Sequence, residues 1–255
     1  MSNYLYQRYH FFHMDTVFTI QLASQRSMDK VEVAQVSQAL HQTDQFLKSV
    51  EESLSPFLET SSLSRYRRRE SVINDKLATI IGLARHLEEK SGYLFHPYDE
   101  RGFNPTSFVK GWAVEEVVKG IWTDLVNQGV LVSIILNGGG DMFCFSQENN
   151  DFEWKVTVAP PNAHLKMDKV ISLRQGGVAT SGKSQRGNHF WKGKSNSLAQ
   201  ITLVGQSLVD MDAWSTLLMT LSDEEVGAFI REHALTATLV TNDNQILQYN
   251  RGLLC

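Results

Sequence analysis

Val209-Asp-Met-Asp-Ala-Trp-Ser-Thr-Leu-Leu-Met-Thr-Leu221 is an apolar stretch in which two oxygen-bearing side chains stand out, Asp212 and Thr216. Residues four apart share one face of a helix, so the carboxylate and the hydroxyl point in the same direction. Such a pair suits a hard cation such as Mg²⁺, which takes oxygen ligands and leaves room for phosphate oxygens. Taken alone, the pattern favours a structural role, in which Asp212 caps the helix and Thr216 bonds back to the preceding turn.

Composition bounds the class of protein. The chain has 255 residues and is 42% hydrophobic, enough for a large buried core. A formal charge of -4 argues against a nucleic acid or an anionic membrane held by bulk electrostatics, although local donors could still hold an anionic small molecule. The two cysteines, Cys144 and Cys255, indicate neither a disulfide framework nor a cysteine metal site.

The sequence also bears on the compartment. Its first residues contain no basic region followed by an apolar stretch, so an export signal is not expected. The longest apolar run, Val130 to Leu136, is far shorter than the roughly 20 residues of a membrane-spanning helix. We therefore expect a cytoplasmic protein without membrane insertion.

Apolar periodicity predicts helices and strands along the whole chain. Helices are expected over residues 27–54, 75–90, 112–128 and 209–221, and from Ser222 to about Arg231. One or two strands are expected over residues 9–23, interrupted at Met14-Asp-Thr16, and further strands over residues 129–145, 154–159, 169–173, 177–180, 199–204, 237–240 and 245–249. Residues 57–69 are predicted to form a polar loop whose basic run is more typical of a solvated surface than of a phosphate site. No repeat or linker divides the chain, which indicates one α+β domain.

Two segments are candidates for contact with a ligand. Polar groups in residues 102–111 precede a predicted helix, where unpaired amides and Lys110 would favour an anion, but an ordinary loop with a solvent-facing lysine explains them equally well. Asn137-Gly-Gly-Gly-Asp141 follows a buried strand, and its glycines allow a ligand to approach the backbone closely. The spacing of these glycines does not match a dinucleotide-binding fingerprint.

Seven segments, in one order, resemble the FAD:protein FMN transferases, the ApbE family. They are Met14-Asp-Thr-Val-Phe-Thr-Ile20, Leu54-Ser-Pro-Phe-Leu-Glu-Thr-Ser-Ser-Leu-Ser-Arg65, Ser91-Gly-Tyr-Leu-Phe-His-Pro97, Lys110-Gly-Trp-Ala-Val-Glu115, Leu136-Asn-Gly-Gly-Gly-Asp141, Val178-Ala-Thr-Ser-Gly182 and Asp212-Ala-Trp-Ser-Thr216. The last is similar to the family's Asp-Ala-x-x-Thr metal motif. Each match is weak alone, but together they cover nearly the whole chain.

The resemblance implies a fold and an activity. The fold would be a single α+β domain over residues 1–255, with mixed or antiparallel sheets and packed helices, similar to a T-fold. The family binds FAD and Mg²⁺, moves the FMN half onto a serine or threonine of another protein, and releases AMP. The implied partners are therefore FAD and an acceptor protein, and the sequence gives no oligomeric state.

The resemblance also implies roles for individual residues. Asp212 and Thr216 would be metal ligands, together with a backbone oxygen of Ser107. His189, in the segment Arg186-Gly-Asn-His-Phe-Trp-Lys-Gly193, matches a histidine thought to act as the base. The positions that match FAD contacts are Met14, Phe57, Leu94, Phe95, His96, Asn104, Lys110 and Trp191.

Three positions that are acidic in the family have other residues here: His96, Asn104 and Lys192. Two alternative functions follow from these departures. One is a flavin-binding protein that kept the pocket and lost transfer, and the other is a metal-dependent FAD pyrophosphatase with water as acceptor. The presence of His189 and of the Asp212 and Thr216 pair favours catalysis over binding alone.

Overall fold

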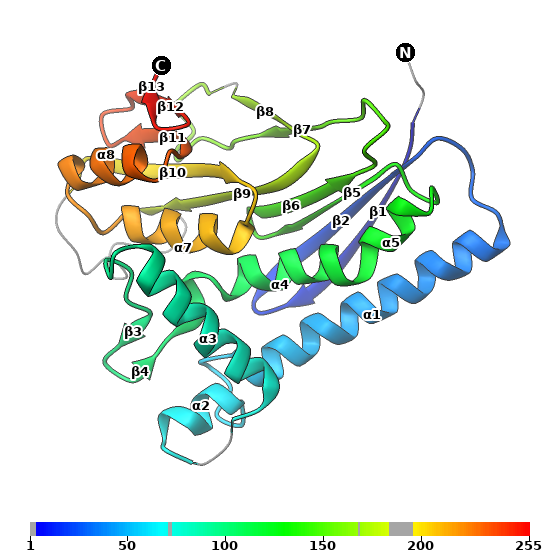
Figure 1. Ribbon diagram of the computed structural model, residues 1–255, viewed down its shortest axis with the longest axis horizontal. Helices are drawn as coiled ribbons and strands as arrows, with labels where there is room; N and C mark the ends of the chain where they lie inside the picture. Colours follow the sequence, from blue (N-terminus) through cyan, green and yellow to red (C-terminus); the bar gives the residue numbers. More distant parts are fainter. Residues whose placement is uncertain (1–3, 71–72, 168, 184–195) are drawn as a thin grey trace.

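The structure is a computed structural model of the chain, and it describes residues 4–70, 73–167, 169–183 and 196–255. Within these residues, a nine-stranded sheet runs in the order β1-β2-β5-β6-β9-β10-β11-β12-β13 (Figure 1). All its neighbouring strands are antiparallel. The strands of this sheet are β1 (Leu5–His13), β2 (Thr16–Ser24), β5 (Ser133–Gly138), β6 (Asp141–Ser146), β9 (Gln175–Gly182), β10 (Leu198–Gly205), β11 (Thr236–Thr241), β12 (Ile246–Asn250) and β13 (Leu253–Leu254).

Two small hairpins and a set of helices complete the described residues. The hairpins are β3 (Tyr98–Asp99) with β4 (Gly102–Phe103), and β7 (Trp154–Thr157) with β8 (Val170–Leu173). The helices are α1 (Lys30–Leu54), α2 (Ser62–Arg67), α3 (Asp75–Lys90), the 3-10 turn η1 (Pro105–Ser107), α4 (Val109–Val117), the π-helical turn η2 (Val118–Trp122), α5 (Thr123–Asn127), α7 (Leu208–Leu218) and α8 (Asp223–Glu232). The predicted α+β class is therefore confirmed.

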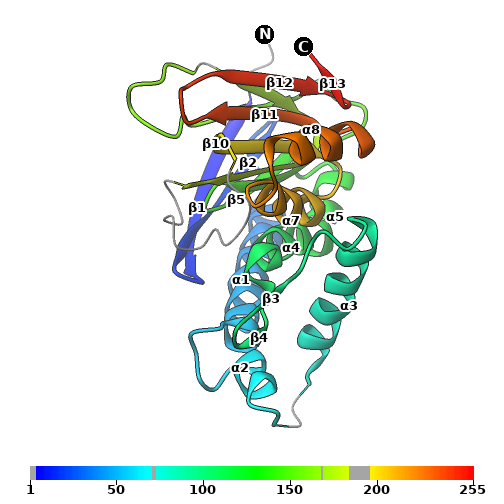
Figure 2. The same ribbon diagram turned by 90° about the vertical axis from the view of Figure 1, so that its left-hand side faces the viewer.

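The sheet separates two cores. Figures 1 and 2 show α1, α4 and α7 against one face of the sheet. Alternate residues of β5 face opposite sides, because successive strand side chains alternate. Ile134 and Leu136 join the main core under the helices, whereas Ile135 joins Trp154 and Leu173 of the β7–β8 hairpin in a second core.

Local signals in the sequence placed several elements well. Asp29 caps α1 in a capping box with Glu32, and Ser222 does the same for α8 with Glu225. The predicted helix over 75–90 has the bounds of α3, which Asn74 caps. The chain does not contain, among its described residues, a helix that is long and apolar enough to cross a bilayer.

Three predicted segments differ from the structure. Residues 57–69 contain a helix, α2, which starts at the cap residue Ser61. The strand expected over 129–145 is the β5–β6 hairpin, whose tight turn is closed by Gly140 N donating to Asn137 Oδ1 at 2.8 Å. The helix expected from Trp112 begins at Val109, so Lys110 lies in its first turn, and a π-helical turn interrupts it before α5.

Helices α4 and α7 are joined by hydrogen bonds from the first-turn amides of each helix to a carboxylate of the other. Asp212 Oδ2 on α7 accepts from Gly111 N on α4 at 2.9 Å. In return, Glu115 Oε2 on α4 accepts from the first amides of α7, Leu208 N at 2.6 Å and Val209 N at 3.1 Å. Each helix therefore supplies a buried carboxylate to amides that its partner leaves unpaired.

Gly111 is the point of closest approach between the two helices. A Cβ atom there would lie 2.8 Å from Asp212 Cβ, which is closer than real Cβ contacts, and a tight 3.0 Å from Leu208 O. The backbone of α4 can reach the Asp212 carboxylate only because position 111 has no side chain.

We predict that Gly111→Ala lowers the free energy of unfolding by about 1–3 kcal/mol, because the new methyl group separates the helices. Gly82→Ala in α3 is the control, since a Cβ there meets nothing within 4 Å, and it should stabilise by about 0.5–1 kcal/mol. Urea unfolding of the three proteins measures both effects. Equal and small changes in the two variants would show that α4 and α7 do not need this contact.

Candidate functional site

Lys110 forms an ion pair at the start of α4. Its Nζ lies 3.0 Å from Asp141 Oδ2, and the other carboxylate oxygen of Asp141 accepts from Thr180 N at 3.1 Å. The Asp141 side chain is buried, and that of Lys110 keeps about a quarter of its surface exposed. The carboxylate therefore fixes the direction of a cation that still reaches solvent.

The turns of two hairpins meet this ion pair. A Cβ atom at Gly139, in the β5–β6 turn, would lie 2.6 Å from Thr16 Oγ1 at the start of β2 and 3.6 Å from Lys110 Nζ. Gly139 has a φ of +67°, which also favours glycine. Met14 lies in the β1–β2 turn with a φ of +52°, and its N donates to Glu51 Oε1 at 3.0 Å. The β5–β6 turn, the first residue of β2 and the start of α4 therefore lie around one ammonium group.

Asp212 and Thr216 lie on α7 as the sequence spacing predicts, but Asp212 does not cap that helix. The N-cap is Ser207, whose hydroxyl accepts from Asp210 N. Asp212 is buried and bonds to α4 instead. Thr216 Oγ1 lies 3.3 Å from Ser181 Oγ at the end of β9, which also lies 2.9 Å from Ser215 Oγ. Three hydroxyls therefore gather where α7 packs on β9, one helical turn from Asp212.

These donors fit Mg²⁺ by their chemistry, because all are hard oxygens and one is a buried carboxylate. Ser107 ends the turn η1, which contacts α7, so its backbone is close to the same helix. No group of three or more histidine, cysteine, aspartate or glutamate side chains suited to a metal occurs in the part of the chain that the structure describes. The predicted set has a single carboxylate and would not form such a group.

The residues predicted to contact FAD are only partly brought together. Phe57, Leu94 and His96 have exposed side chains in the loops before α2 and after α3, free to contact a ligand. Phe95 is different, because its ring is buried edge-to-face on Phe108 at 6.0 Å. Only its backbone can contact a ligand. His189 and Trp191 lie outside the described residues.

Asn104 and His96, two of the residues expected from the resemblance to replace acidic ones, each have a carboxylate neighbour. Asn104 Nδ2 donates to Asp99 Oδ2 at 2.8 Å, while its own Oδ1 accepts from Thr106 N and caps η1. His96 Nδ1 lies 3.7 Å from Glu88 Oε1. Negative charge is thus present beside both substituted positions, although it comes from other residues.

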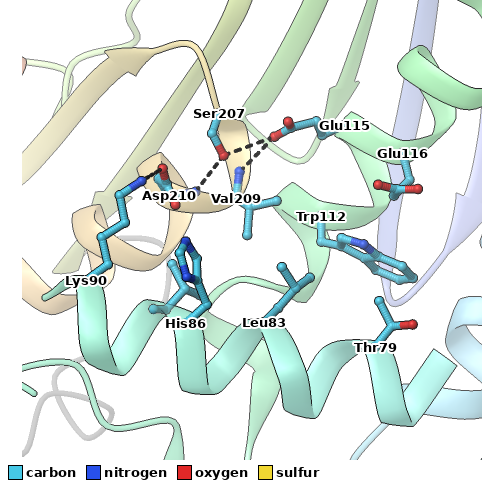
Figure 3. A pocket seen from close by; sticks show the side chains of 11 residues that line it. Thr79, Leu83, His86, Lys90, Trp112, Glu115, Glu116, Ser207, Val209 and Asp210 are labelled. Atoms are coloured by element: carbon cyan, nitrogen blue, oxygen red, sulfur yellow. Dashed lines mark hydrogen bonds and ion pairs between the residues drawn. The ribbon is translucent and has the colours of Figure 1, made fainter. Parts of the chain in front are cut away.

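A cavity of about 310 Å³ lies elsewhere, between α3, α4 and the first turn of α7 (Figure 3). Three of its charged groups have partners: Lys90 Nζ lies 2.5 Å from Asp210 Oδ2, and Glu115 binds the first amides of α7 and Lys119. Burial and the neighbouring Glu115 raise the pKa of Glu116. None of the predicted site residues lines this cavity, so we regard it as part of the helix joint.

Sequence reasoning assigned no role to three residues that build the site. Glu115 was quoted only as part of a motif, although it holds α7 in place. Ser181 and Ser215 surround Thr216. Ser181 belongs to Val178-Ala-Thr-Ser-Gly182 and Ser215 to Asp212-Ala-Trp-Ser-Thr216, so a signal was present in the motifs themselves.

Comparison with known proteins decides the family. The model of the ApbE family matches residues 99–239, more than half of the chain. The chain belongs to the ApbE family. The matched segment includes Asn104, Ser107, Lys110, Asp212 and Thr216.

Individual ApbE relatives are distant in sequence. The FAD:protein FMN transferases of Escherichia coli strains K12 and O157:H7 are each 21% identical in a 149-residue alignment that covers 52% of this chain. The match spans 41% of the length of those curated relatives.

Solved structures show the same fold over nearly the whole chain. The apo flavinyl transferase ApbE of Pseudomonas stutzeri superposes with a TM-score of 0.76 at 14% identity, covering 98% of this chain and 97% of that one. The ApbE protein of Thermotoga maritima gives a TM-score of 0.74 at 14% identity, covering 96% and 97%. Vibrio cholerae ApbE gives 0.71 at 14% identity, covering 97% of each chain. The ApbE-like fold that the sequence predicts is therefore confirmed.

We predict that Lys110→Met lowers the free energy of unfolding by about 1–2 kcal/mol, because it leaves the buried Asp141 carboxylate without its cation. The estimate is at the low end because Lys110 is partly exposed to solvent. Lys30→Met, an exposed substitution at the start of α1, is the matched control and should change stability by less than about 0.5 kcal/mol. Denaturant unfolding of the two variants measures the difference. An unchanged unfolding midpoint in Lys110→Met would show that the ion pair with Asp141 does not stabilise the fold.

Proposed function

We propose that this ApbE-family protein transfers FMN from FAD to a serine or threonine of a partner protein in a Mg²⁺-dependent reaction that releases AMP. The observation that carries the proposal is the buried Asp212 carboxylate at the start of α4, where Lys110 projects, one helical turn along α7 from the hydroxyl of Thr216, which lies 3.3 Å from Ser181 Oγ. A binding site for a divalent cation and one for phosphate oxygens would then adjoin each other. That pairing is what cleavage of a pyrophosphate needs.

Each part of the site has a role in this reaction. Asp212, Thr216 and the backbone oxygen of Ser107 would hold the metal. Mg²⁺, when bound, neutralises charge that develops on the phosphate oxygens. Lys110, directed by Asp141, adds a positive charge at the same end of α4, and the helix amides add donors.

The acceptor hydroxyl forms a bond to the FMN phosphorus as the pyrophosphate P–O bond breaks and AMP leaves. His189 takes the proton of that hydroxyl, which a histidine near neutral pKa can do. The residues that stand at acidic family positions do not argue against transfer, because Asp99 and Glu88 supply carboxylates beside Asn104 and His96.

We predict that Asp212→Asn raises the Mg²⁺ concentration needed for half-maximal AMP release at least about tenfold, since the loss of a group that merely supports a ligand already costs that much. The asparagine can still accept from Gly111 N, so the helices stay joined. Asp151→Asn, whose side chain is fully exposed, is the control. AMP is measured after incubation with FAD at a series of Mg²⁺ concentrations, and an unchanged Mg²⁺ dependence would exclude Asp212 as a ligand.

The same incubation distinguishes the three activities. It includes a peptide that carries the family's usual Asp-x-x-Thr/Ser-Gly-Ala-Thr/Ser pattern, and the flavin mass on the peptide is recorded. Mg²⁺-dependent AMP with labelled peptide is the expected result. AMP without labelling would indicate a pyrophosphatase, and bound but intact FAD would indicate a binding protein.

His189→Ala tests the base separately. We expect flavin transfer to the peptide to fall by about 10²–10⁴-fold, the usual contribution of a general base, while FAD binding is retained. His164→Ala, a surface histidine, is the control. If AMP release by His189→Ala equalled that of the parent, the proton would be taken by another group.

A further inference from the structure

A second cavity, of about 890 Å³, lies between α2 and the β3–β4 hairpin. Its wall combines guanidinium groups with aromatic rings. The residues that line it are Tyr66, Arg67, Arg69, Glu70, Ile73, Tyr98, Glu100, Arg101, Gly102 and Phe103. Its volume is far larger than an inorganic anion needs and is within the range of organic ligand sites.

Arg67 is a buried guanidinium with few acceptors. Its side chain is only 7% exposed. Within the described residues, its contacts with acceptors are Nε to Phe103 O at 2.7 Å and Nη2 to Asp99 Oδ2 at the long distance of 3.5 Å. Asp99 meanwhile accepts shorter bonds from Asn104 Nδ2 and Arg101 N. A buried cation is costly unless it is well paired, so further negative charge would be stabilised here.

The remaining charges leave the wall positive. Glu70 is held by Arg65 and Arg68, each at 2.8 Å, and Glu100 also has a partner. By contrast, the side chains of Arg69 and Arg101 form no hydrogen bond or ion pair with another of the described residues. Burial lowers the pKa of Arg67, Asp99 opposes that shift, and Arg101 adds to it. This concentration of positive charge occurs on a chain whose net charge is -4.

The cavity borders the candidate site and also has apolar surface. Phe103 lines it and directly precedes Asn104, a position predicted to contact FAD. The Tyr98 ring packs edge-to-face on Phe103 at 5.8 Å, and more than half of the surface of both Tyr98 and Ile73 is exposed. A ligand with carboxylates alone would leave these apolar groups in water, whereas a peptide can cover them.

We propose that this cavity, which we call the arginine cavity, docks a segment of the acceptor protein rich in aspartate or glutamate, so that the neighbouring hydroxyl is presented to the flavin site. Arginine forks match carboxylates in geometry, and charged rims raise the rate of encounter. The inference rests on the proposed function, because it identifies where the acceptor binds. The arginine cavity would select acceptors by the charge that flanks the modified residue.

The test uses two fluorescent peptides with the same serine- and threonine-containing core, one flanked by glutamates and the other by glutamines. Fluorescence anisotropy measures their affinity for the full chain without turnover. We expect the glutamate peptide to bind more tightly, and its advantage to fall in 0.5 M salt because exposed charges are screened. The double variant Arg69→Gln/Arg101→Gln should weaken its binding about fivefold.

Arg251→Gln is the matched control, because the substitution removes the same type of charge. Arg251 lies in the turn between β12 and β13, which is far from α2 in Figure 1. Its affinity for the glutamate peptide should equal that of the parent. Equal binding of the two peptides, or full affinity in the double variant, would overturn the proposal. Docking without any flavin transfer would leave the arginine cavity assigned and count against the proposed function alone.

Discussion

The crossing of α4 and α7 is the contact on which the candidate site depends. Asp212 Oδ2 reaches Gly111 N because a glycine lets the two backbones come close, and Glu115 returns the interaction to the first amides of α7. The bond that fixes Asp212 also fixes the start of α4, where Lys110 emerges. The position of Asp212 relative to Lys110 is therefore set by the contact between two helices.

Local signals in the sequence predicted much of the secondary structure, and the elements that they missed have a common cause. Caps such as Ser222 with Glu225 act within one turn, so a sequence pattern can predict them. The β5–β6 hairpin was taken for one strand because both of its faces are buried, which removes the alternation that separates strands. The start of α4 at Val109 depends on its packing with α7, which the segment itself does not encode.

The same limit applies to the site. The spacing of Asp212 and Thr216 predicted a shared helix face, but the choice between a cap and a site residue depended on Gly111, 101 residues away in the chain. The role of Glu115 at the start of α7 could not be predicted for the same reason, since a helix is expected to be capped by residues next to it in the sequence. Residue types indicate which chemistry is available, whereas only tertiary contacts show which group each side chain serves.

Carboxylates lie beside two of the residues that are interpreted from the sequence as departures from the family pattern. Asn104 is neutral, but it is held by Asp99, which lies across the β3–β4 hairpin, and His96 lies near Glu88 at the end of α3. An electrostatic field depends on where charge lies in space and not on which residue carries it. The Asp99 carboxylate also faces Arg67, so it connects the predicted flavin position with the arginine cavity.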